Sequence, residues 1–162
     1  MAGQTDLVLS NLGFKAYMSA VGETPTAADR LVGIKSMSGY GVSVNTLDAT
    51  ELDGTGFARF VASLKTLKPI TLGFNLRDKG TYKRLYEQAF DKETGSEDYY
   101  VDITFVFPKK TGWDTDVVRD ITITACITDF SLDDVNTDSV QAFTVTVQGQ
   151  DKPVPFTGTI SE

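Results

Sequence analysis

Apolar and polar residues alternate strictly in two stretches of the chain, Tyr99-Tyr-Val-Asp-Ile-Thr-Phe-Val-Phe107 and Ile121-Thr-Ile-Thr-Ala-Cys-Ile-Thr128. A period of two places every second side chain on the same face of an extended strand, so each stretch predicts a strand with one buried face. The same alternation predicts further strands over residues 14–19, 31–37, 42–46, 70–76, 143–148 and 154–160. The turn residues Ser38-Gly-Tyr-Gly41 predict that the strands on either side of them form a hairpin.

One segment follows a helical period instead. Tyr82, Leu85, Tyr86 and Ala89 are spaced at i, i+3, i+4 and i+7, which predicts a helix over residues 81–90 with a buried stripe. Gly80 and Thr81 are the expected N-terminal cap, and residues 91–95 end the helix. The sequence therefore predicts one mainly β (α+β) domain over residues 1–162, an antiparallel β-barrel or sandwich with one flanking α-helix.

The segment between the early strands, residues 45–68, is the long loop of this prediction. Phe57, Phe60, Val61 and Leu64 have helical spacing, which indicates one or two helical turns within it. A connection of this length is usually functional or disordered, and the aromatic residues argue against disorder. Two interpretations stay open: a loop that orders against a partner, and a flap folded on its own core.

Composition excludes several classes of protein. The 162 residues include 15 Lys and Arg, 22 Asp and Glu, no His and one Cys, with a formal net charge of −7. That charge argues against binding nucleic acid through its phosphates. Without His there is no Ser-His-Asp triad and no Cys-His pair, which excludes these nucleophilic systems but not a pair of carboxylates. Our prediction is no enzyme, no catalytic residue and no cofactor. We expect no metal either, because residues 134–139 resemble a calcium loop only in part and are better explained as a turn.

Charge is segregated along the chain. Residues 59–84 carry seven bases and one acid, residues 87–102 six acids and one base, and residues 114–138 seven acids and one base. Ordinary solvated faces explain this pattern, and so does head-to-tail self-assembly, in which a basic patch meets an acidic patch of the next copy.

Several strings of the sequence resemble the major tail proteins (tail tube proteins) of long-tailed, non-contractile bacteriophages. They are Leu31-Val-Gly-Ile-Lys-Ser-Met-Ser-Gly39, Val42-Ser-Val-Asn-Thr-Leu-Asp48, Lys68-Pro-Ile-Thr-Leu-Gly-Phe-Asn-Leu76, Phe143-Thr-Val-Thr-Val147 and Phe156-Thr-Gly158. With the order of strands and helix, the resemblance covers roughly residues 10–160.

This resemblance implies a structural virion protein. Its copies would form hexameric rings that stack into the tail tube through which DNA is delivered, without the C-terminal immunoglobulin-like domain of some relatives. The implied partners are other copies of the chain, the tape-measure protein, and the tail terminator and tail-tip proteins; viral DNA would pass without specific binding, and no membrane is involved. The implied location is the virion tail, assembled in the bacterial host cytoplasm.

The resemblance also assigns residues to the assembly. Segment 45–68 would be the arm that reaches the adjacent ring, and our hypothesis for the contact residues is Glu51, Asp53, Phe57, Arg59, Phe60 and Leu64. Because a channel for DNA should repel phosphates, we also expect acids at the lumen or its rim, namely Asp120, Asp129 and Asp138.

The alternatives belong to other classes. A β-sandwich binding module of the carbohydrate-binding or adhesin type predicts a stable monomer, and a small hydrolase with paired carboxylates predicts loss of activity on a single acid substitution. Within the tube class, the alternative is the tube of a contractile tail or of a type VI secretion system.

Overall fold

The computed structural model describes residues 13–52, 54, 56–108, 120–158 and 160. Its helices are α1 (Lys79–Phe90) and the short 3-10 helices η1 (Ala27–Asp29) and η2 (Glu97–Tyr99). Its strands are β1 (Lys15–Ala20), β2 (Ile34–Ser38), β3 (Val42–Asp48), β4 (Phe60–Leu67), β5 (Ile70–Asn75), β6 (Tyr100–Val106), β7 (Ile121–Leu132) and β8 (Ala142–Pro155).

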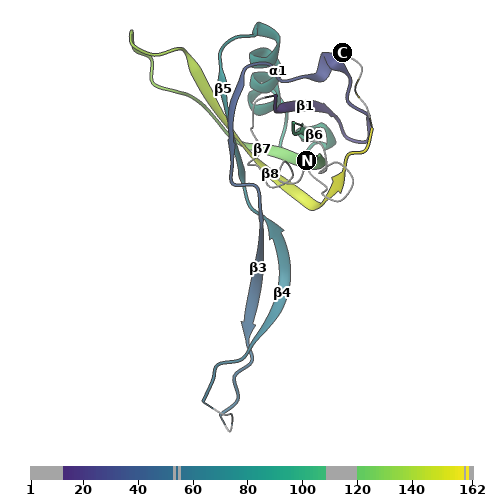
Figure 1. Ribbon diagram of the computed structural model, residues 1–162, viewed down its shortest axis with the longest axis vertical. Coiled ribbons are helices and arrows are strands. Elements are labelled where there is room, and N and C mark those ends of the chain that lie inside the picture. The colour runs from purple at the N-terminus through teal and green to yellow at the C-terminus, as the bar shows by residue number, and fades with distance from the viewer. Residues whose placement is uncertain (1–12, 53, 55, 109–119, 159, 161–162) are drawn as a thin grey trace, which may run out of the picture.

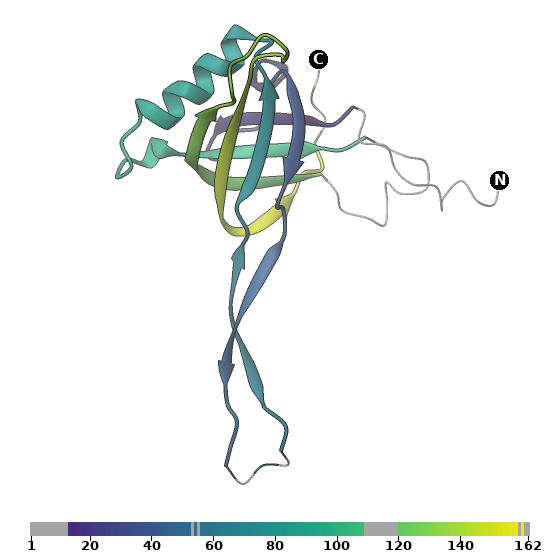
Figure 2. The same ribbon diagram turned by 90° about the vertical axis from the view of Figure 1, so that its left-hand side faces the viewer.

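Most of the strands within the described residues form one antiparallel sheet in the order β1-β6-β7-β8-β5-β2, which we name the main sheet. The sheet curls into a half-barrel, and α1 lies beside it at the end away from the β3–β4 hairpin (Figure 2). The segment before β2 approaches the opposite edge of the curl, where Arg30 bridges Tyr17 of β1 and the Leu31 amide donates to the Ala16 carbonyl at 2.8 Å. The mainly β fold with one flanking helix is thus confirmed.

The predicted alternation produces the core. Ile121, Ile123, Ala125 and Ile127 of β7 are all buried, and they face buried apolar residues of β6 and β8 in register. β7 and β8 are long, and each pairs with the other and with one further strand. β6 pairs with the first half of β7, and β5 pairs with the first half of β8. Register shifts in the β7–β8 pair bend these strands around the barrel.

Helix α1 packs on the core through aromatic rings and Leu85. Tyr82 meets Phe143 edge to face, with ring centroids 5.4 Å apart, and Leu85 is fully buried. The helix begins at the N-cap Asp78, whose carboxylate accepts from the Thr81 amide at 2.9 Å, so the cap predicted at Gly80 and Thr81 lies two residues too late.

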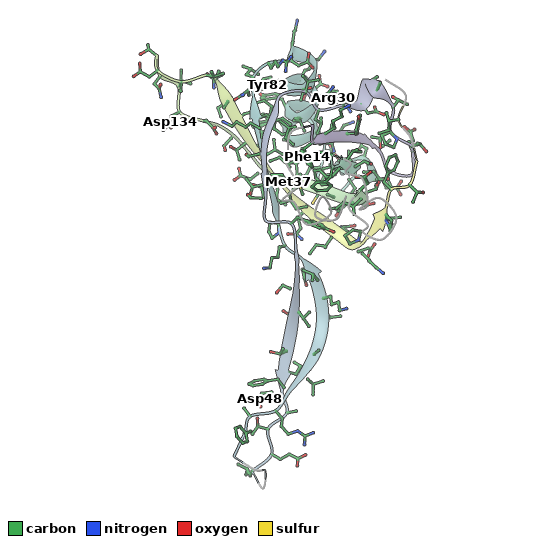
Figure 3. All side chains as sticks on the ribbon, viewed as in Figure 1. Phe14, Arg30, Met37, Asp48, Tyr82 and Asp134 are labelled. Carbon is green, nitrogen blue, oxygen red and sulfur yellow. The ribbon has the colours of Figure 1, made fainter. Side chains whose placement is uncertain are left out.

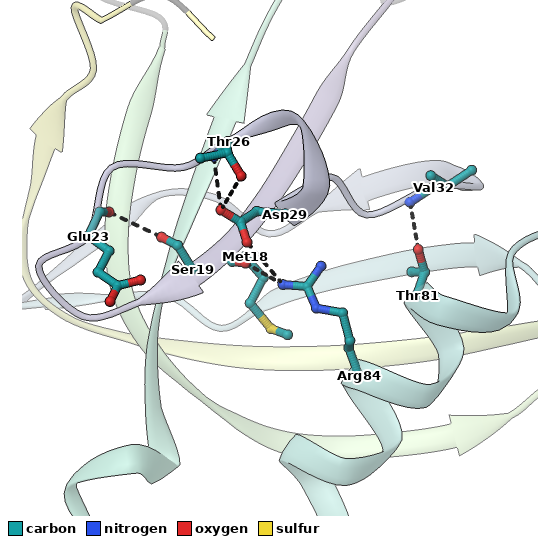
Figure 4. Close-up of polar contacts among 8 residues, drawn as sticks. All are labelled: Met18, Ser19, Glu23, Thr26, Asp29, Val32, Thr81 and Arg84. Atoms are coloured by element: carbon teal, nitrogen blue, oxygen red, sulfur yellow. Dashed lines mark hydrogen bonds and ion pairs between the residues drawn. The ribbon is translucent and has the colours of Figure 1, made fainter. Parts of the chain in front are cut away.

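Polar contacts fasten the same helix to the segment that closes the half-barrel (Figure 4). The Arg84 guanidinium donates to the Met18 carbonyl of β1 and lies 3.8 Å from the Asp29 carboxylate of η1. The Thr81 hydroxyl accepts from the Val32 amide at 2.9 Å. One face of α1 therefore holds β1, η1 and the start of β2 in place.

Two predicted features of the strands are wrong. β2 and β3 do not pair with each other across Ser38-Gly-Tyr-Gly41; β2 pairs with β5 and β3 pairs with β4. The strand expected over residues 154–160 is not a separate element, because β8 continues to Pro155 and the described residues beyond it are not in a strand.

The helical turns expected in segment 45–68 are also replaced, by an extended hairpin. β3 and β4 pair from Val42 opposite Leu67 to Asp48 opposite Phe60, and the hairpin projects from the main sheet along the long axis of the molecule (Figure 1). We name residues 42–67 the arm. Its register continues that of β2 and β5, in which Ser38 faces Thr71. The chain thus forms one long hairpin whose base lies in the main sheet and whose outer part leaves it.

Candidate assembly surfaces

The arm exposes an unusual amount of apolar surface. Phe57 is 82% exposed and Leu64 is 73% exposed, although side chains of this size are usually buried. The other exposed large apolar residues of the arm are Val42, Val44, Leu47, Leu52, Phe60 and Val61. A contiguous surface of this kind marks an interaction site, and a two-stranded hairpin by itself is marginally stable in water.

Both faces of the arm contribute to this surface. Leu47 and Val61 are directly opposite each other, so their side chains share one face; Phe60 occupies the other face, since it adjoins Val61 and successive residues of a strand point to opposite sides. A flap folded on its own core would bury one of these faces. The structure therefore does not show segment 45–68 as a flap folded on its own core, and the interpretation that it orders against a partner stays a prediction.

The predicted contact residues lie together on this arm. Phe60 and Leu64 belong to β4, while Glu51, Phe57 and Arg59 lie at the tip between the strands. Asp53 falls outside the described residues. The tip is fastened by Thr50, whose hydroxyl accepts from the Arg59 amide at 2.9 Å. Hydrogen bonds from Thr50 to the Asp48 carboxylate lower the pKa of Asp48 below its usual range.

A second surface is the polar face of the main sheet. Two rows of small polar residues cross β2, β5, β8 and β7 in register on the face opposite the core. One row consists of Ser38, Thr71, Thr146 and Asp129, and the other of Ser36, Gly73, Thr144 and Ser131. Side chains at the ends of these rows are exposed, so this face is open to solvent.

Both edges of this four-stranded part of the sheet are open. β6 pairs with β7 only as far as Cys126. Among the described residues, no strand pairs with the edge of β2 that faces away from β5, or with the edge of β7 that faces away from β8 beyond Cys126. Unpaired edges of this kind are templates for pairing with another chain.

The three predicted acids are not gathered in one place. Asp129 lies on the open polar face, and Asp138 lies in the connection 133–141 between β7 and β8. Asp120 is 8% exposed, and its carboxylate accepts from the Phe107 amide at 3.0 Å. The structure thus gives Asp120 a place inside the fold, and only Asp129 and Asp138 present charge to solvent.

The connection 133–141 projects at the end of the molecule opposite the arm. Asp134 on this connection and Asp48 near the arm tip mark the two ends (Figure 3). The predicted turn is confirmed: the Asn136 side-chain oxygen accepts from the Asp138 amide at 2.9 Å and from the Ser139 hydroxyl at 3.0 Å. Among the described residues, no group of three or more Asp, Glu or Cys side chains could hold a metal ion.

A further apolar surface, which we name the aromatic seam, lies where α1 crosses β7. It consists of Tyr86, Phe90, Phe130 and Leu132. The rings of Tyr86 and Phe90 stack at 4.4 Å, and Phe130 meets both edge to face, at 6.0 and 5.7 Å. Phe90 is 59% exposed and Leu132 is 53% exposed. The sequence assigned Tyr86 to a buried stripe and so missed this surface.

No family model matches the sequence, and no curated protein matches it either. Solved structures do match the fold. A chain in the tail of an empty gene transfer agent particle, determined with C6 symmetry, is 11% identical with a TM-score of 0.67; the match covers 92% of this chain and 99% of that one. A chain of the sheath-tube complex of an extracellular contractile injection system, PVC, is 17% identical with a TM-score of 0.62, covering 87% and 86%. A chain of the 6-fold symmetrised baseplate of the anti-feeding prophage is 11% identical with a TM-score of 0.65, covering 92% and 96%.

These matches cover nearly all of each chain, so the whole described fold, and not only its sheet, is shared with subunits of phage-like tails and injection systems. At such low identity the likeness establishes the fold alone. None of the helices in the described residues has the length and apolar character needed to span a bilayer.

Proposed function

We propose that this chain is a structural subunit of a phage-like tail tube, without enzymatic activity, whose copies form rings that stack through the arm. The observation that carries the proposal is the arm, which exposes large apolar side chains on both faces while the main sheet has a complete core of its own. A surface of this kind requires a partner on each side. The likeness to chains from tails and sheath-tube complexes supports the same role.

The open edges of the main sheet account for a ring. Neighbouring strands in the order β7-β8-β5-β2 are antiparallel, so β2 and β7 run in opposite directions. When β2 of one copy lies beside the free part of β7 in the next, the new pair is antiparallel as well. The sheet then continues from copy to copy into a closed wall, which removes every open edge. Six copies per ring is our proposal, in line with the C6 and 6-fold symmetry of the matched assemblies.

In such a wall the polar face would line the channel. Hydroxyl side chains and Asp129 would form its surface, and Asp138 would lie toward a rim. A lumen of this composition in a protein of net charge −7 has few cations to hold phosphates, so DNA would slide past without specific binding.

The partners follow from this role. We propose that the tube encloses a tape-measure protein, ends at terminator and tip proteins, and belongs to the tail of a particle assembled in the bacterial host cytoplasm. Chains from a sheath/tube terminator complex and from a tube-terminating cap share the fold. Because the matched chains come from both a gene transfer agent tail and contractile systems, tubes of contractile tails and type VI secretion systems remain the nearest alternative.

Electron microscopy of the purified chain with and without its arm tests the proposal. Residues 45–64 are replaced by Asn-Gly, a two-residue turn that joins Val44 to Lys65 where the two strands already pair. We expect hollow tubes from the intact chain in a concentration series, and rings or monomers from the shortened one. Circular dichroism and thermal unfolding show that the shortened chain still folds.

Two results would contradict this proposal. Tubes of normal length from the shortened chain would exclude the arm as the stacking element. A monomer at every concentration of the intact chain would contradict the tube and favour the binding module, which a glycan array then tests.

A further inference from the structure

We infer that the arm of one copy docks on the aromatic seam of another copy. This inference rests on the proposed function and names the surface that receives the arm. The seam is the exposed apolar surface formed by Tyr86, Phe90, Phe130 and Leu132, where α1 crosses β7.

No layer of described residues covers either surface. On the arm, Phe57, Phe60 and Leu64 are each more than half exposed; on the seam, Phe90 and Leu132 are as well. Aromatic rings prefer offset or edge-to-face neighbours, and the exposed ring of Phe90 already stacks on Tyr86 from within the chain. An aromatic side chain from the arm would extend this stack, which makes the seam a better receptor than an aliphatic surface.

The positions of the two surfaces suit contacts that repeat from copy to copy. The arm projects from one end of the main sheet, and the helix and connection 133–141 lie toward the other end (Figure 1). Two different surfaces on one chain make a heterologous contact, which leaves a free arm and a free seam after each addition. Such a contact extends into a stack, as the proposed function requires.

Charge at the two surfaces is complementary. Glu87 of α1 and the C-cap residue Asp91 are exposed beside Tyr86 and Phe90, at the negative end of the helix macrodipole. Glu87 lies 3.9 Å from the Lys83 ammonium, whereas Asp91 has no ion pair among the described residues. On the arm, Arg59 lies between Phe57 and Phe60 in sequence, and its side chain has no ion-pair partner among the described residues. Asp48, the acid of β3 that lies opposite Phe60, already accepts hydrogen bonds from Thr50. A docked arm would bring Arg59 to the acids of α1.

Disulfide crosslinking between copies tests the inference. In a Cys126→Ser background, chains with Phe57→Cys are mixed with chains carrying Leu132→Cys, allowed to assemble and then oxidised. The matched control replaces Leu132→Cys with Val154→Cys, which lies at a position of similar exposure, 62%, on β8. We expect at least about tenfold more mixed dimer with Leu132→Cys, because a docked arm holds the two thiols at a millimolar effective concentration.

An assembly measurement keeps the test independent of thiol geometry. Phe90→Lys removes a seam ring and places a cation in the last turn of α1, which favours the helix itself. We expect it to raise the protein concentration needed for tubes by about tenfold, as loss of a buried aromatic anchor does, while Val154→Lys leaves that concentration unchanged.

The outcomes separate this inference from the proposed function. Tubes that form but give no excess of Phe57–Leu132 dimers, or that give mainly Phe57–Phe57 dimers, would overturn the seam as receptor and leave the tube proposal standing. Failure of the intact chain to assemble at all would overturn both, and microscopy of the unmodified protein reports that result separately.

Discussion

The arm and the main sheet are built from the same apolar and β-branched residue types, yet they place them in opposite environments. In the main sheet, alternate side chains enter a core shared by β5–β8 and α1, and Phe143 is 1% exposed. In the arm, a residue of the same type, Phe57, is 82% exposed. Strand pairing is present in both regions, so a second layer makes the difference. Strand pairing alone therefore does not bury apolar side chains, and in the proposed function the missing layer over the arm is another copy of the chain.

The largest effect expected from this comparison concerns those two phenylalanines. Phe143 stacks on Phe74 at 5.1 Å and on Phe130 at 5.5 Å, so Phe143→Ala leaves a cavity in the core and should cost about 3–5 kcal/mol of the free energy of unfolding. Phe57→Ala should change that free energy by less than about 0.5 kcal/mol, since it removes no contact with the core. Denaturant unfolding of the monomeric protein measures both. Equal losses in the two variants would show that the arm is part of the cooperative fold.

The next largest change in the free energy of unfolding is expected at the junction, where β2 continues into β3 and β4 into β5. Gly39 has a φ of +88°, and a Cβ added there would overlap the Pro69 carbonyl oxygen of the opposite strand. Gly39→Ala should therefore destabilise the protein by about 1–3 kcal/mol. Gly95→Ala is the matched control, because nothing lies within 4 Å of an added Cβ there. A neutral Gly39→Ala variant would mean that the junction does not need the left-handed conformation.

A smaller effect is expected where α1 holds the edge of the half-barrel. Arg84→Met keeps the apolar stem but removes the hydrogen bond to the Met18 carbonyl and the ion pair with Asp29, which should cost about 1 kcal/mol. The control, Lys83→Met, breaks an exposed pair with Glu87 on the same helix and should cost no more than about 0.5 kcal/mol. Thermal unfolding of both variants checks the difference, and indistinguishable midpoints would contradict the role given to Arg84.

The sequence predicted the main sheet better than it predicted the arm, for a physical reason. The alternation over residues 121–128 predicts one buried face, and β7 has that face in the core. In β6 the prediction is only half right, because the polar alternates Asp102 and Thr104 are buried as well; they accept or share hydrogen bonds with Thr124 and Thr122 of β7. In the arm, the spacing of Phe57, Phe60, Val61 and Leu64 imitates a helix, because both faces of the hairpin carry apolar side chains and period two is lost. A hairpin with apolar side chains on both faces therefore has no period-two signal from which its strands could be predicted.

The remaining errors have local causes. Ser38-Gly-Tyr-Gly41 has the residues of a tight turn, but here the glycines let the strand pass from the main sheet into the arm without reversing. For the candidate surfaces, the sequence singled out the exposed apolar residues of the arm, whose role as contacts stays a prediction, and it did not point to the exposed residues of the aromatic seam. Exposure of Phe90 and Leu132 depends on where α1 crosses β7, which no spacing within either segment reports.

The smallest expected effect is a difference between the main sheet and the arm in how the free energy of unfolding depends on pH. Asp78 at the start of α1 and Asp48 in the arm both have a pKa below the usual range, because each accepts hydrogen bonds from a threonine, Thr81 and Thr50 respectively. A carboxyl whose pKa is lower in the folded protein stabilises it above the unfolded pKa of about 4, and this contribution is lost as the pH falls through the folded pKa. A carboxyl group contributes to this loss of unfolding free energy only if global unfolding breaks the hydrogen bonds that lower its pKa.

Asn replaces either acid without titrating and still accepts the capping hydrogen bond. We therefore expect Asp78→Asn to make the free energy of unfolding depend less steeply on pH below about pH 4. We expect Asp48→Asn to change that dependence less, because a two-stranded hairpin without a covering layer is marginally stable and is already open in part of the monomer population before the main sheet unfolds. Denaturant unfolding from about pH 5 to about pH 2.5, across the acid limb of carboxyl titration, measures both slopes. If Asp48→Asn reduced the slope as much as Asp78→Asn, the arm would unfold together with the main sheet, and its side chains would be held in the single copy more firmly than their exposure indicates.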